Sequence, residues 1–337
     1  MSLLIVYGTR PEYLKCKSLI NELIKNGIEH KVLFTGQQKD LAKFPNDWSI
    51  RIDDGLNRLD SIVKSLMDNL VYILKLYEFR NITHVLVQGD TTTALAMALS
   101  AFHHGLKVIH LEAGLRTYDK QNPYPEEINR RLISQIADIH LCPTEQNQNN
   151  LFNEISYSGN IHVVGNTVID NLLEYKDKCE YTNKILVTLH RRENHHLIDQ
   201  WFIEIDKLAE KYPQYEFIFP MHPNPNIQKY KDLLKNVKVI NPLPYDEMLN
   251  LLVKTRLVIT DSGGLQEECS FFNKKCLTCR ITTERPEAIG QSTFMVSSPD
   301  VLENIFNLSH NSYEIDYECP FGDGHSAEKI VEILKKI

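Results

Sequence analysis

The stretch LLIVYGTRPEYLK, residues 3–15, decides the fold class. It begins with Leu3 to Tyr7, an uninterrupted apolar run typical of a strand that is buried on both faces of a parallel sheet. Gly8 follows as a turn residue, and Pro11 stands in the expected first turn of a helix, where its missing N–H does no harm. A strand, a glycine turn and a helix in this order indicate an α/β domain.

The same alternation of short apolar runs and longer amphipathic stretches continues along the chain. In the first half we expect further strands at 31–34, 84–87, 107–111 and 161–164, and helices at 11–25, 59–77, 91–104, 126–137 and 144–154. In the second half we expect strands at 185–189, 216–220, 237–240, 257–260 and 275–277, and helices at 199–211, 226–235, 245–253 and 265–272. Both series are typical of doubly wound parallel sheets.

A chain of 337 residues exceeds the usual size of one hydrophobic core, so two domains are expected. We predict an N-terminal Rossmann-like domain over residues 1–168 and a C-terminal Rossmann-like domain over residues 169–321. The charged segment 173–182 is interpreted as the linker, and a last helical pattern at 326–337 fits either domain. The predicted fold class is α/β, with two Rossmann-like domains that face a cleft and bind ligands at the carboxyl ends of their strands.

The composition excludes several classes of protein. Hydrophobic residues make up 42% and charged residues 24% of the chain, close to the globular average, which argues against a disordered or fibrous protein. The net charge of −7 argues against a nucleic-acid binder. No apolar stretch approaches the length of a membrane span, so we expect no membrane association. Seven scattered cysteines do not resemble a disulfide framework, which favours a cytoplasmic location.

Charged residues gather where the predicted strands of the first domain end. Arg10 and Lys15 stand beside the N-terminus of the first helix, where they favour binding of an anion. Asp90 and Glu112 follow two successive strands, and Glu126 lies in a further loop segment. Carboxylates crowded at one edge of a sheet raise some of their pKa values, so that they can act as acids and bases near neutral pH.

Each of these residues also has a structural explanation. Asp90 is an N-cap by default, because it stands at the start of a predicted helix. Glu127 and Arg130, three positions apart on a helix, can form a surface pair. Arg10 and Lys15 can be solvated cations at an ordinary turn.

The second domain offers a candidate phosphate site. Ser262 to Gly264 open a helix after a strand, where backbone N–H groups and the helix dipole favour an anion. His190 and His222 follow the first two strands of this domain. Glu268 can accept hydrogen bonds from ribose hydroxyls, and Arg285, at the end of another strand, can close the same pocket. The segment lacks the lysine of a P-loop, so it does not indicate ATP hydrolysis.

Other patterns do not indicate a metal or a nicotinamide nucleotide. Cys276 and Cys279 form one CxxC without a second pair, and the adjacent histidines at 103–104 and 195–196 lack the spacing of a helical metal site. The chain also lacks a GxGxxG fingerprint. We therefore expect no metal and no cofactor.

Several segments together resemble the non-hydrolysing UDP-N-acetylglucosamine 2-epimerase family. They are GTRPE with Lys15, QGDTTT, EAGLRT, PYPEEINRR, VGNTVID, LHRREN and TDSGGLQEE, in the order of the family and from residue 8 to about residue 287. The resemblance implies a glycosyltransferase-B architecture, a homodimer, and a last helix within 322–337 that packs back on the first domain. It also implies interconversion of UDP-N-acetylglucosamine and UDP-N-acetylmannosamine without a metal, by elimination of UDP to 2-acetamidoglucal and re-addition.

The resemblance also implies roles for individual residues. The catalytic residues are expected to be Asp90, Glu112, Glu126, His190 and Lys15. The residues expected to bind the UDP-sugar, with Arg285 included from its place at a strand end, are Arg10, His222, Ser262, Gly263, Gly264, Glu268 and Arg285. The clustered carboxylates favour proton transfer over transfer of a sugar to an acceptor.

Two segments depart from the family pattern. The stretch from Gln37 to Asp60 is short and divergent, and Asn194 to Leu197 lacks the glycine that commonly follows HRREN. In bacterial members these regions help to form a second, activating UDP-sugar site, so we expect little or no allosteric activation. Alternative substrates are 6-deoxy sugars of the rhamnosamine or fucosamine type and 2,3-diacetamido sugars, and an alternative outcome is hydrolysis that releases N-acetylmannosamine. A non-catalytic sensor of nucleotide sugars is the alternative outside enzymes.

Overall fold

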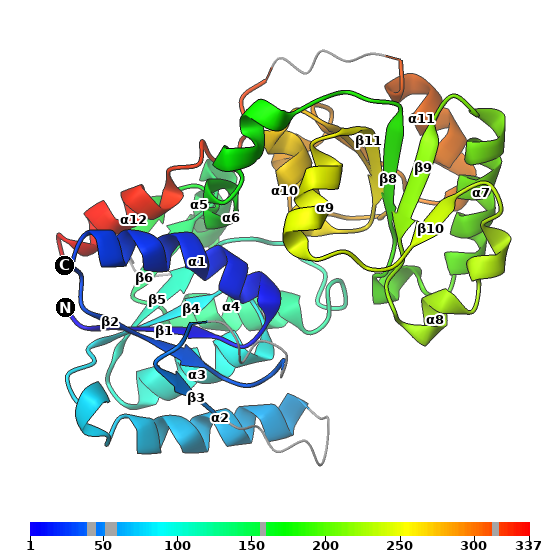
Figure 1. Cartoon of the computed structure of the whole chain (residues 1–337). Helices are drawn as coiled ribbons and strands as arrows, with labels where there is room; N and C mark the ends of the chain where they lie inside the picture. The colour runs from blue at the N-terminus through cyan, green and yellow to red at the C-terminus, as the bar shows by residue number, and fades with distance from the viewer. Residues whose placement is uncertain (39–44, 51–58, 156–159, 312–316) are drawn as a thin grey trace. The chain divides into compact units, whose positions relative to one another are not determined.

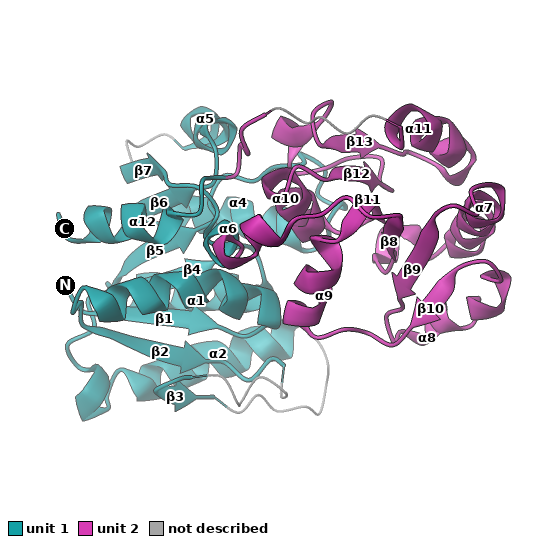
Figure 2. Cartoon of the chain, turned by 45° about the horizontal axis from the view of Figure 1, so that its top comes forward, with its two compact units in different colours: residues 1–171, 322–337 teal, residues 172–321 magenta. Residues whose placement is uncertain are grey.

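The computed structural model describes residues 1–38, 45–50, 59–155, 160–311 and 317–337 (Figure 1). These residues form two compact units, shown in different colours in Figure 2. Unit 1 contains Met1–Asn171 and Gly322–Ile337, and unit 2 contains Leu172–Phe321. The division falls close to the domain boundaries that we predict at 168 and 321, and the C-terminal segment belongs to unit 1.

Unit 1 is built on a parallel sheet. Among the described residues its strand order is β3-β2-β1-β4-β5-β6-β7. The strands are β1 (Leu3–Tyr7), β2 (His30–Phe34), β3 (Trp48–Ser49), β4 (His84–Gln88), β5 (Lys107–Leu111), β6 (Ile139–Cys142) and β7 (Asn160–Val163). Neighbouring strands run parallel, so the loops at their carboxyl ends lie along one edge of the sheet.

Helices cover both faces of this sheet. They are α1 (Arg10–Lys25), α2 (Leu59–Ile73), α3 (Thr92–His103), α4 (Glu126–Ile136), α5 (Glu145–Glu154), α6 (Thr167–Asp170) and α12 (Ser326–Leu334), with a 3-10 turn at Tyr77–Phe79. Leu4 and Val6 of β1 face a core formed with α2 and α3, whereas Leu3 and Ile5 face a core formed with α1 and α12. Successive strand residues point to opposite faces, which explains why β1 is continuously apolar.

Unit 2 contains a second parallel sheet. Its strand order among the described residues is β10-β9-β8-β11-β12-β13. The strands are β8 (Lys184–Thr188), β9 (Glu216–Pro220), β10 (Lys238–Ile240), β11 (Thr255–Thr260), β12 (Lys275–Thr278) and β13 (Thr293–Met295). The helices are α7 (Ile198–Lys211), α8 (Pro225–Gln228), α9 (Tyr245–Leu252), α10 (Gly263–Phe271) and α11 (Leu302–Ser309). Short 3-10 turns occur at Leu173–Lys178, Arg192–Asn194, Lys231–Leu233, Pro286–Ala288 and Pro299–Val301.

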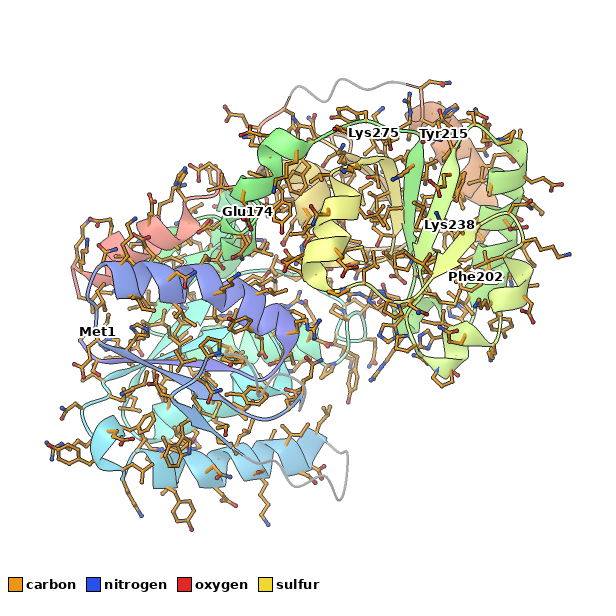
Figure 3. All side chains as sticks on the ribbon, viewed as in Figure 1. Met1, Glu174, Phe202, Tyr215, Lys238 and Lys275 are labelled. Atoms are coloured by element: carbon orange, nitrogen blue, oxygen red, sulfur yellow. The ribbon has the colours of Figure 1, made fainter. Side chains whose placement is uncertain are left out.

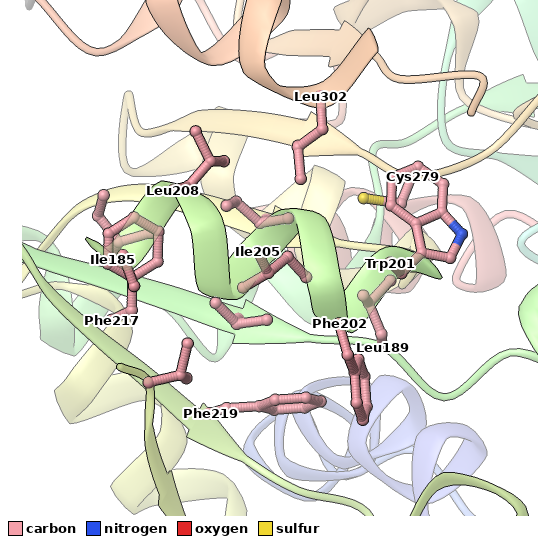
Figure 4. Close-up of a cluster of buried hydrophobic side chains, with 14 of the residues drawn as sticks. Ile185, Leu189, Trp201, Phe202, Ile205, Leu208, Phe217, Phe219, Cys279 and Leu302 are labelled. Carbon is pink, nitrogen blue, oxygen red and sulfur yellow. The ribbon is translucent and has the colours of Figure 1, made fainter. Parts of the chain in front are cut away.

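An aromatic and aliphatic core lies between α7 and this sheet (Figure 4). Trp201, Phe202 and Ile205 of α7 are buried in it. The rings of Phe202 and Phe219 meet edge to face at 5.4 Å. Figure 3 labels Phe202 on α7 and Lys238 on the adjoining β10. This core holds the strands whose carboxyl ends carry the polar loops of unit 2.

The prediction of two parallel α/β domains is confirmed, although several elements differ from the expected ones. The sequence pattern does not reveal β3, β6, β13, α6 or α11. Elements as short as β3, β13 and α6 show little periodicity, and His140 interrupts the apolar run of β6. The helix expected at 226–235 is divided into α8 and a 3-10 turn. The helix expected at 59–77 ends at Ile73. The expected linker contains the 3-10 turn Leu173–Lys178. No helix in the described ranges is long and apolar enough to cross a bilayer.

Candidate active site

The turn between β1 and α1 is held rigidly by Glu12. Its buried carboxylate accepts hydrogen bonds from the backbone N–H groups of Gly8, at 2.8 Å, and Thr9, at 2.7 Å. The same carboxylate accepts from Thr91 Oγ1 at 2.5 Å, which ties this turn to the one that follows β4. A Cβ on Gly8 would come within 2.8 Å of Thr93 Oγ1, so only glycine fits there. The glycine turn thus forms part of one rigid edge of the sheet.

Glu112 is the most constrained residue at this edge. It follows β5 directly and has a φ of 64°, a left-handed conformation that non-glycine residues seldom adopt. Gln88 Nε2 donates to Glu112 Oε2 at 2.5 Å, and Asn166 Nδ2 donates to Oε1 at 3.0 Å. Lys15 Nζ forms an ion pair with the same carboxylate. Backbone strain of this kind concentrates at functional sites, where the surroundings hold it in place.

Asp90 follows β4 and is bound by α4. Arg130 donates to Asp90 Oδ2 from Nε at 3.0 Å and from Nη2 at 2.5 Å. Asn129 Nδ2 donates to the backbone oxygen of Asp90 at 2.9 Å. Two charge-assisted bonds from one arginine fix the direction of this carboxylate.

The pair Glu127 and Arg130 is buried, which corrects its interpretation as a surface pair. Arg130 Nη1 donates to Glu127 Oε2 at 3.2 Å, and the backbone N–H groups of Thr117 and Tyr118 donate to the Glu127 carboxylate at 3.0 and 3.1 Å. Glu127 therefore fixes the loop before α4 and helps to orient Arg130 toward Asp90.

Two predicted residues stand at helix N-termini. Glu126 is the first residue of α4, and Arg10 is the first residue of α1, with an exposed side chain. Gln38 Oε1 accepts from the backbone N–H of Arg10 at 2.8 Å. Since α4 is bound to Asp90 through its second turn, Glu126 is carried by the same helix that orients Asp90.

In unit 2, Asp261 organises the loop that contains His190. Asp261 follows β11, and its side chain is 0% exposed. The backbone N–H groups of His190 and Arg191 donate to its Oδ2 at 3.0 and 2.8 Å, and Asn194 Nδ2 donates to the same oxygen at 3.1 Å. His190 Nδ1 lies 3.5 Å from Asp261 Oδ1. This buried carboxylate thus holds the LHRREN loop at the carboxyl end of β8.

His190 and His222 lie against each other. Their ring centroids are 5.5 Å apart and their planes differ by 13°. Partial burial lowers the pKa of His190, and the Asp261 carboxylate opposes that shift. The backbone N–H of Asn224 donates to His222 Nδ1 at 3.2 Å. The two predicted histidines therefore form one cluster.

The N-terminus of α10 is formed by Ser262 to Gly264. Ser262 is the N-cap, but its side chain makes no capping hydrogen bond to the helix. A Cβ on Gly263 would lie 2.6 Å from Arg285 Nη1 and 2.8 Å from Glu284 Oε1, so a larger residue would force these side chains to move. The segment has the backbone geometry of an anion-binding helix N-terminus.

Arg285 lies against Gly263 of this segment, and its role in closing the pocket stays a prediction. Its residue is 5% exposed, and Nε donates to Glu267 Oε1 at 2.6 Å while Nη1 is bound to Glu284. Arg280 pairs with Glu284 at 2.9 Å and with Glu193 of the His190 loop at 2.8 Å. These buried ion pairs support the Gly263 backbone and join it to the neighbouring loops.

Glu268, on the same helix, is held by a tyrosine. Tyr245 donates from its hydroxyl to Glu268 Oε1 at 3.1 Å. Burial, together with this nearby carboxylate, raises the pKa of Tyr245. Glu268 is itself buried, so the tyrosine fixes the direction of a carboxylate that water reaches only slightly.

Sequence patterns alone do not single out the partners of these residues. Gln88, Asn166, Arg130 and Asp261 all lie within the conspicuous segments QGDTTT, VGNTVID, PYPEEINRR and TDSGGLQEE, but only tertiary contacts show what they bind. No sequence signal marks Tyr245. Within the ranges that the structure describes, no group of three or more histidine, cysteine, aspartate or glutamate residues is arranged to hold a metal ion.

Two parallel α/β units with polar loops at the carboxyl ends of their strands define a glycosyltransferase-B-like α/β protein. A family model described as UDP-N-acetylglucosamine 2-epimerase matches residues 21–335, and the chain belongs to this family. Its members are isomerases that act on carbohydrate derivatives. The predictions of the family and of the enzyme class are therefore confirmed.

Full-length relatives support this assignment. The UDP-N-acetylglucosamine 2-epimerase of Neisseria meningitidis serogroup A is 38% identical over 373 residues, with 100% of both chains covered. The enzyme of Campylobacter jejuni is 38% identical, with 99% of this chain and 97% of its own covered. The first alignment is longer than the 337 residues of this chain, so that relative carries segments that this chain lacks.

Solved structures agree over the whole chain. UDP-GlcNAc 2-epimerase from Neisseria meningitidis bound to UDP-GlcNAc superimposes with a TM-score of 0.90, 36% identity and 100% of both chains covered. The enzyme from Methanocaldococcus jannaschii, in complex with UDP-GlcNAc and UDP, has a TM-score of 0.84, 31% identity and the same coverage.

Proposed function

We propose that this chain interconverts UDP-N-acetylglucosamine and UDP-N-acetylmannosamine. Family membership and the similarity to an epimerase with bound UDP-GlcNAc support this substrate. The observation that carries the proposal is Glu112, a carboxylate held in a left-handed conformation by Lys15, Gln88 and Asn166. An arrangement that holds a strained, buried acid so firmly is better suited to proton transfer than to binding alone.

The reaction proceeds by elimination and re-addition. A base takes the proton from C2 while the bond between C1 and the diphosphate oxygen breaks, which leaves 2-acetamidoglucal and UDP. The reverse step returns a proton to the opposite face of C2, and the diphosphate oxygen attacks C1 again. The C2 proton is not acidic, because no carbonyl is adjacent, so catalysis requires a positioned base and stabilisation of the leaving diphosphate.

The carboxylates of unit 1, together with His190 of unit 2, perform the proton transfers in this proposal. Asp90, Glu112 and Glu126 are the catalytic carboxylates, and Lys15 and Arg10 supply positive charge. Arg130 holds Asp90 through two nitrogen atoms, so it fixes the direction of that carboxylate. Lys15 does the same for Glu112.

The residues of unit 2 bind the nucleotide. The N-terminus of α10, from Ser262 to Gly264, binds the diphosphate, with His222 close by in the same unit as a further polar group. Glu268, oriented by Tyr245, accepts hydrogen bonds from the ribose hydroxyls. Arg285 packs against the Gly263 backbone and supports it.

We also propose a homodimer in the cytoplasm. The family resemblance supports the dimer. Sedimentation experiments measure the oligomeric state. All seven cysteines are free thiols, which suits a reducing compartment.

Incubation of the protein with UDP-N-acetylglucosamine, followed by NMR of the sugar anomeric and C2 signals, tests the function. We expect an equilibrium mixture with UDP-N-acetylmannosamine. Release of free N-acetylmannosamine would instead show hydrolysis, transfer to an added acceptor would show a glycosyltransferase, and binding without turnover would show a sensor.

A further inference from the structure

The stacked histidines of unit 2 have different neighbours at the same ring atom. At Nδ1, His190 faces a carboxylate and His222 faces a backbone N–H group. A neutral imidazole carries its proton on one nitrogen only, and the partner of one nitrogen decides the state of the other.

His190 is placed to carry its proton on Nδ1. Asp261 Oδ1 lies 3.5 Å from that atom, and the carboxylate is 0% exposed. A lone pair on Nδ1 would face the negative charge of the buried Asp261 carboxylate, whereas an N–H is attracted to it. The Nε2 of neutral His190 is therefore left as a hydrogen-bond acceptor.

His222 is placed to carry its proton on Nε2. The backbone N–H of Asn224 donates to its Nδ1 at 3.2 Å. A nitrogen that accepts a hydrogen bond has its lone pair there and no proton. The Nε2–H of His222 is therefore a donor.

We propose, on the basis of the function proposed above, that Asp261 is a positioning residue that makes this pair asymmetric. His190 presents an accepting Nε2 to the substrate, and the stacked His222 presents a donating Nε2–H. An acceptor suits proton transfer at the sugar, and a donor suits an oxygen of the leaving diphosphate. The stacked rings, whose planes differ by only 13°, thus provide a hydrogen-bond acceptor and a hydrogen-bond donor next to each other.

Replacement of Asp261 by asparagine should move the His190 proton from Nδ1 to Nε2. The N–H groups of His190 and Arg191 and the amide of Asn194 all donate to Oδ2 of the carboxylate, and the His190 N–H also reaches Oδ1, at the longer distance of 3.2 Å. In Asp261→Asn the remaining oxygen takes these donors, so the new NH2 group faces His190 Nδ1. That nitrogen must then accept, and the proton moves to Nε2.

Nitrogen-15 NMR of the imidazole rings in the unaltered protein tests the proposal directly. The spectra are recorded at about pH 9, above the ordinary histidine range. The signals are assigned by their loss in His190→Gln and His222→Gln. We expect a protonated Nδ1 in His190 and a protonated Nε2 in His222. A protonated Nε2 in His190, or a protonated Nδ1 in His222, overturns the proposal.

Two variants distinguish the role of Asp261 in placing the His190 proton from its role in holding the LHRREN loop. We expect Asp261→Asn to move the His190 proton to Nε2 and to lower kcat by roughly a hundredfold, as for loss of one general base. Asn194→Ala is the matched control, because it removes a loop bond to Asp261 and keeps the carboxylate. We expect His190 to keep its Nδ1 proton in this variant. A His190 proton that stays on Nδ1 in folded Asp261→Asn overturns the proposal. If Asp261→Asn does not fold, the spectrum of the unaltered protein alone decides whether the proposal holds.

The donor role of His222 has its own test. Glutamine places an N–H where His222 Nε2–H lies, and alanine does not. We expect His222→Gln to keep most of the affinity for UDP and His222→Ala to lose about tenfold. Equal losses in the two variants contradict the donor assignment. Absence of epimerase activity in the unaltered protein would refute the proposed function, while the NMR result would still report on Asp261.

Discussion

At the scale of single residues, Glu112 shows how the site opposes local folding preferences. A left-handed conformation at a non-glycine residue costs about 1–3 kcal/mol. Three side chains from distant parts of unit 1 hold the carboxylate and so keep the backbone there. We infer that the strain is retained because it directs this acid toward the reacting sugar.

Removal of a catalytic carboxylate should lower turnover much more than it lowers the affinity for UDP. Asp90→Asn, Glu112→Gln and Glu126→Gln keep the size of each side chain but remove a base, so we expect each to lower turnover by at least roughly a hundredfold. The affinity for UDP should change much less, because residues of unit 2 bind the nucleotide in our proposal. Calorimetry and steady-state kinetics measure the two quantities. Glu78→Gln, an exposed carboxylate on a 3-10 turn, is the control.

Near-normal turnover in all three variants would leave the catalytic assignment without support. Equal losses of turnover and affinity would indicate that these residues bind the substrate and do not transfer protons.

The sequence predicts which residues carry chemistry better than it predicts what holds them. Asp90, Glu112 and His190 are conspicuous because polar residues follow apolar strands. Their partners are not conspicuous, because Asn166 stands 54 positions from Glu112 and Asp261 stands 71 from His190. Such pairings depend on strand order in the sheet, which periodicity does not specify. The burial of Arg285 against Gly263 could not be predicted for the same reason.

At the scale of elements, the N-terminus of α10 depends on a glycine with no room for a side chain. Gly263→Val should weaken UDP binding by more than about tenfold, or about 1.4 kcal/mol, because its side chain would displace Arg285 and Glu284. Gly264→Ala should lose less, since the nearest atom to its Cβ is Ser262 Oγ at 3.9 Å. Calorimetry with UDP compares the variants. Unchanged affinity in folded Gly263→Val would remove this segment from the UDP site.

The neighbouring strands β5 and β6 carry a buried histidine pair in register. Burial lowers the pKa of His110 to about 4 and that of His140 to about 3, from a usual value of 6.5. Both pKa values in the folded protein lie below the unfolded value of 6.5. The stability that the neutral rings contribute is therefore complete above about pH 6.5 and is lost as the pH falls from there toward the folded pKa values. At pH 4.5 we expect a loss of roughly 2 kcal/mol for each histidine.

Urea unfolding at pH 7 and pH 4.5 measures this loss. His140→Asn should reduce the decline in the free energy of unfolding between the two pH values by roughly 2 kcal/mol. The exposed His103→Asn should leave the decline unchanged. An equal decline in His140→Asn and the unaltered protein would show that His140 does not stay neutral in the fold.

A continuous apolar run predicts β1, and a clear apolar period predicts α7, each to within a few residues. Short elements could not be predicted, because β13 has three residues and its position depends on pairing with β12. The helix expected at 226–235 is interrupted because helices gain most of their stability from packing, and of this segment only Ile227 and Leu234 are buried in the core.

At the scale of the whole molecule, the segments that depart from the family pattern bear on regulation. Residues 39–44 and 51–58 of the first departing segment lie outside the described residues. Because Gln37 to Asp60 and Asn194 to Leu197 depart from the family pattern, we expect a hyperbolic dependence of rate on substrate, with a Hill coefficient near one. Steady-state kinetics at constant enzyme concentration measure it. A coefficient clearly above one that falls on replacement of Gln37 or Gln38 would show that allosteric activation is retained.

Exchange of the C2 proton with solvent tests the central claim most directly. Elimination must break the C2–H bond, and a carboxylate base exchanges the proton it has taken with water. Turnover of UDP-N-acetylglucosamine in heavy water should therefore place deuterium at C2 of the UDP-N-acetylmannosamine formed, and NMR of the product shows it. Traces of UDP and 2-acetamidoglucal should also escape. Product that carries only the original hydrogen at C2, with no released 2-acetamidoglucal, would contradict elimination with exchange and would indicate internal return of the hydrogen or a transient oxidation.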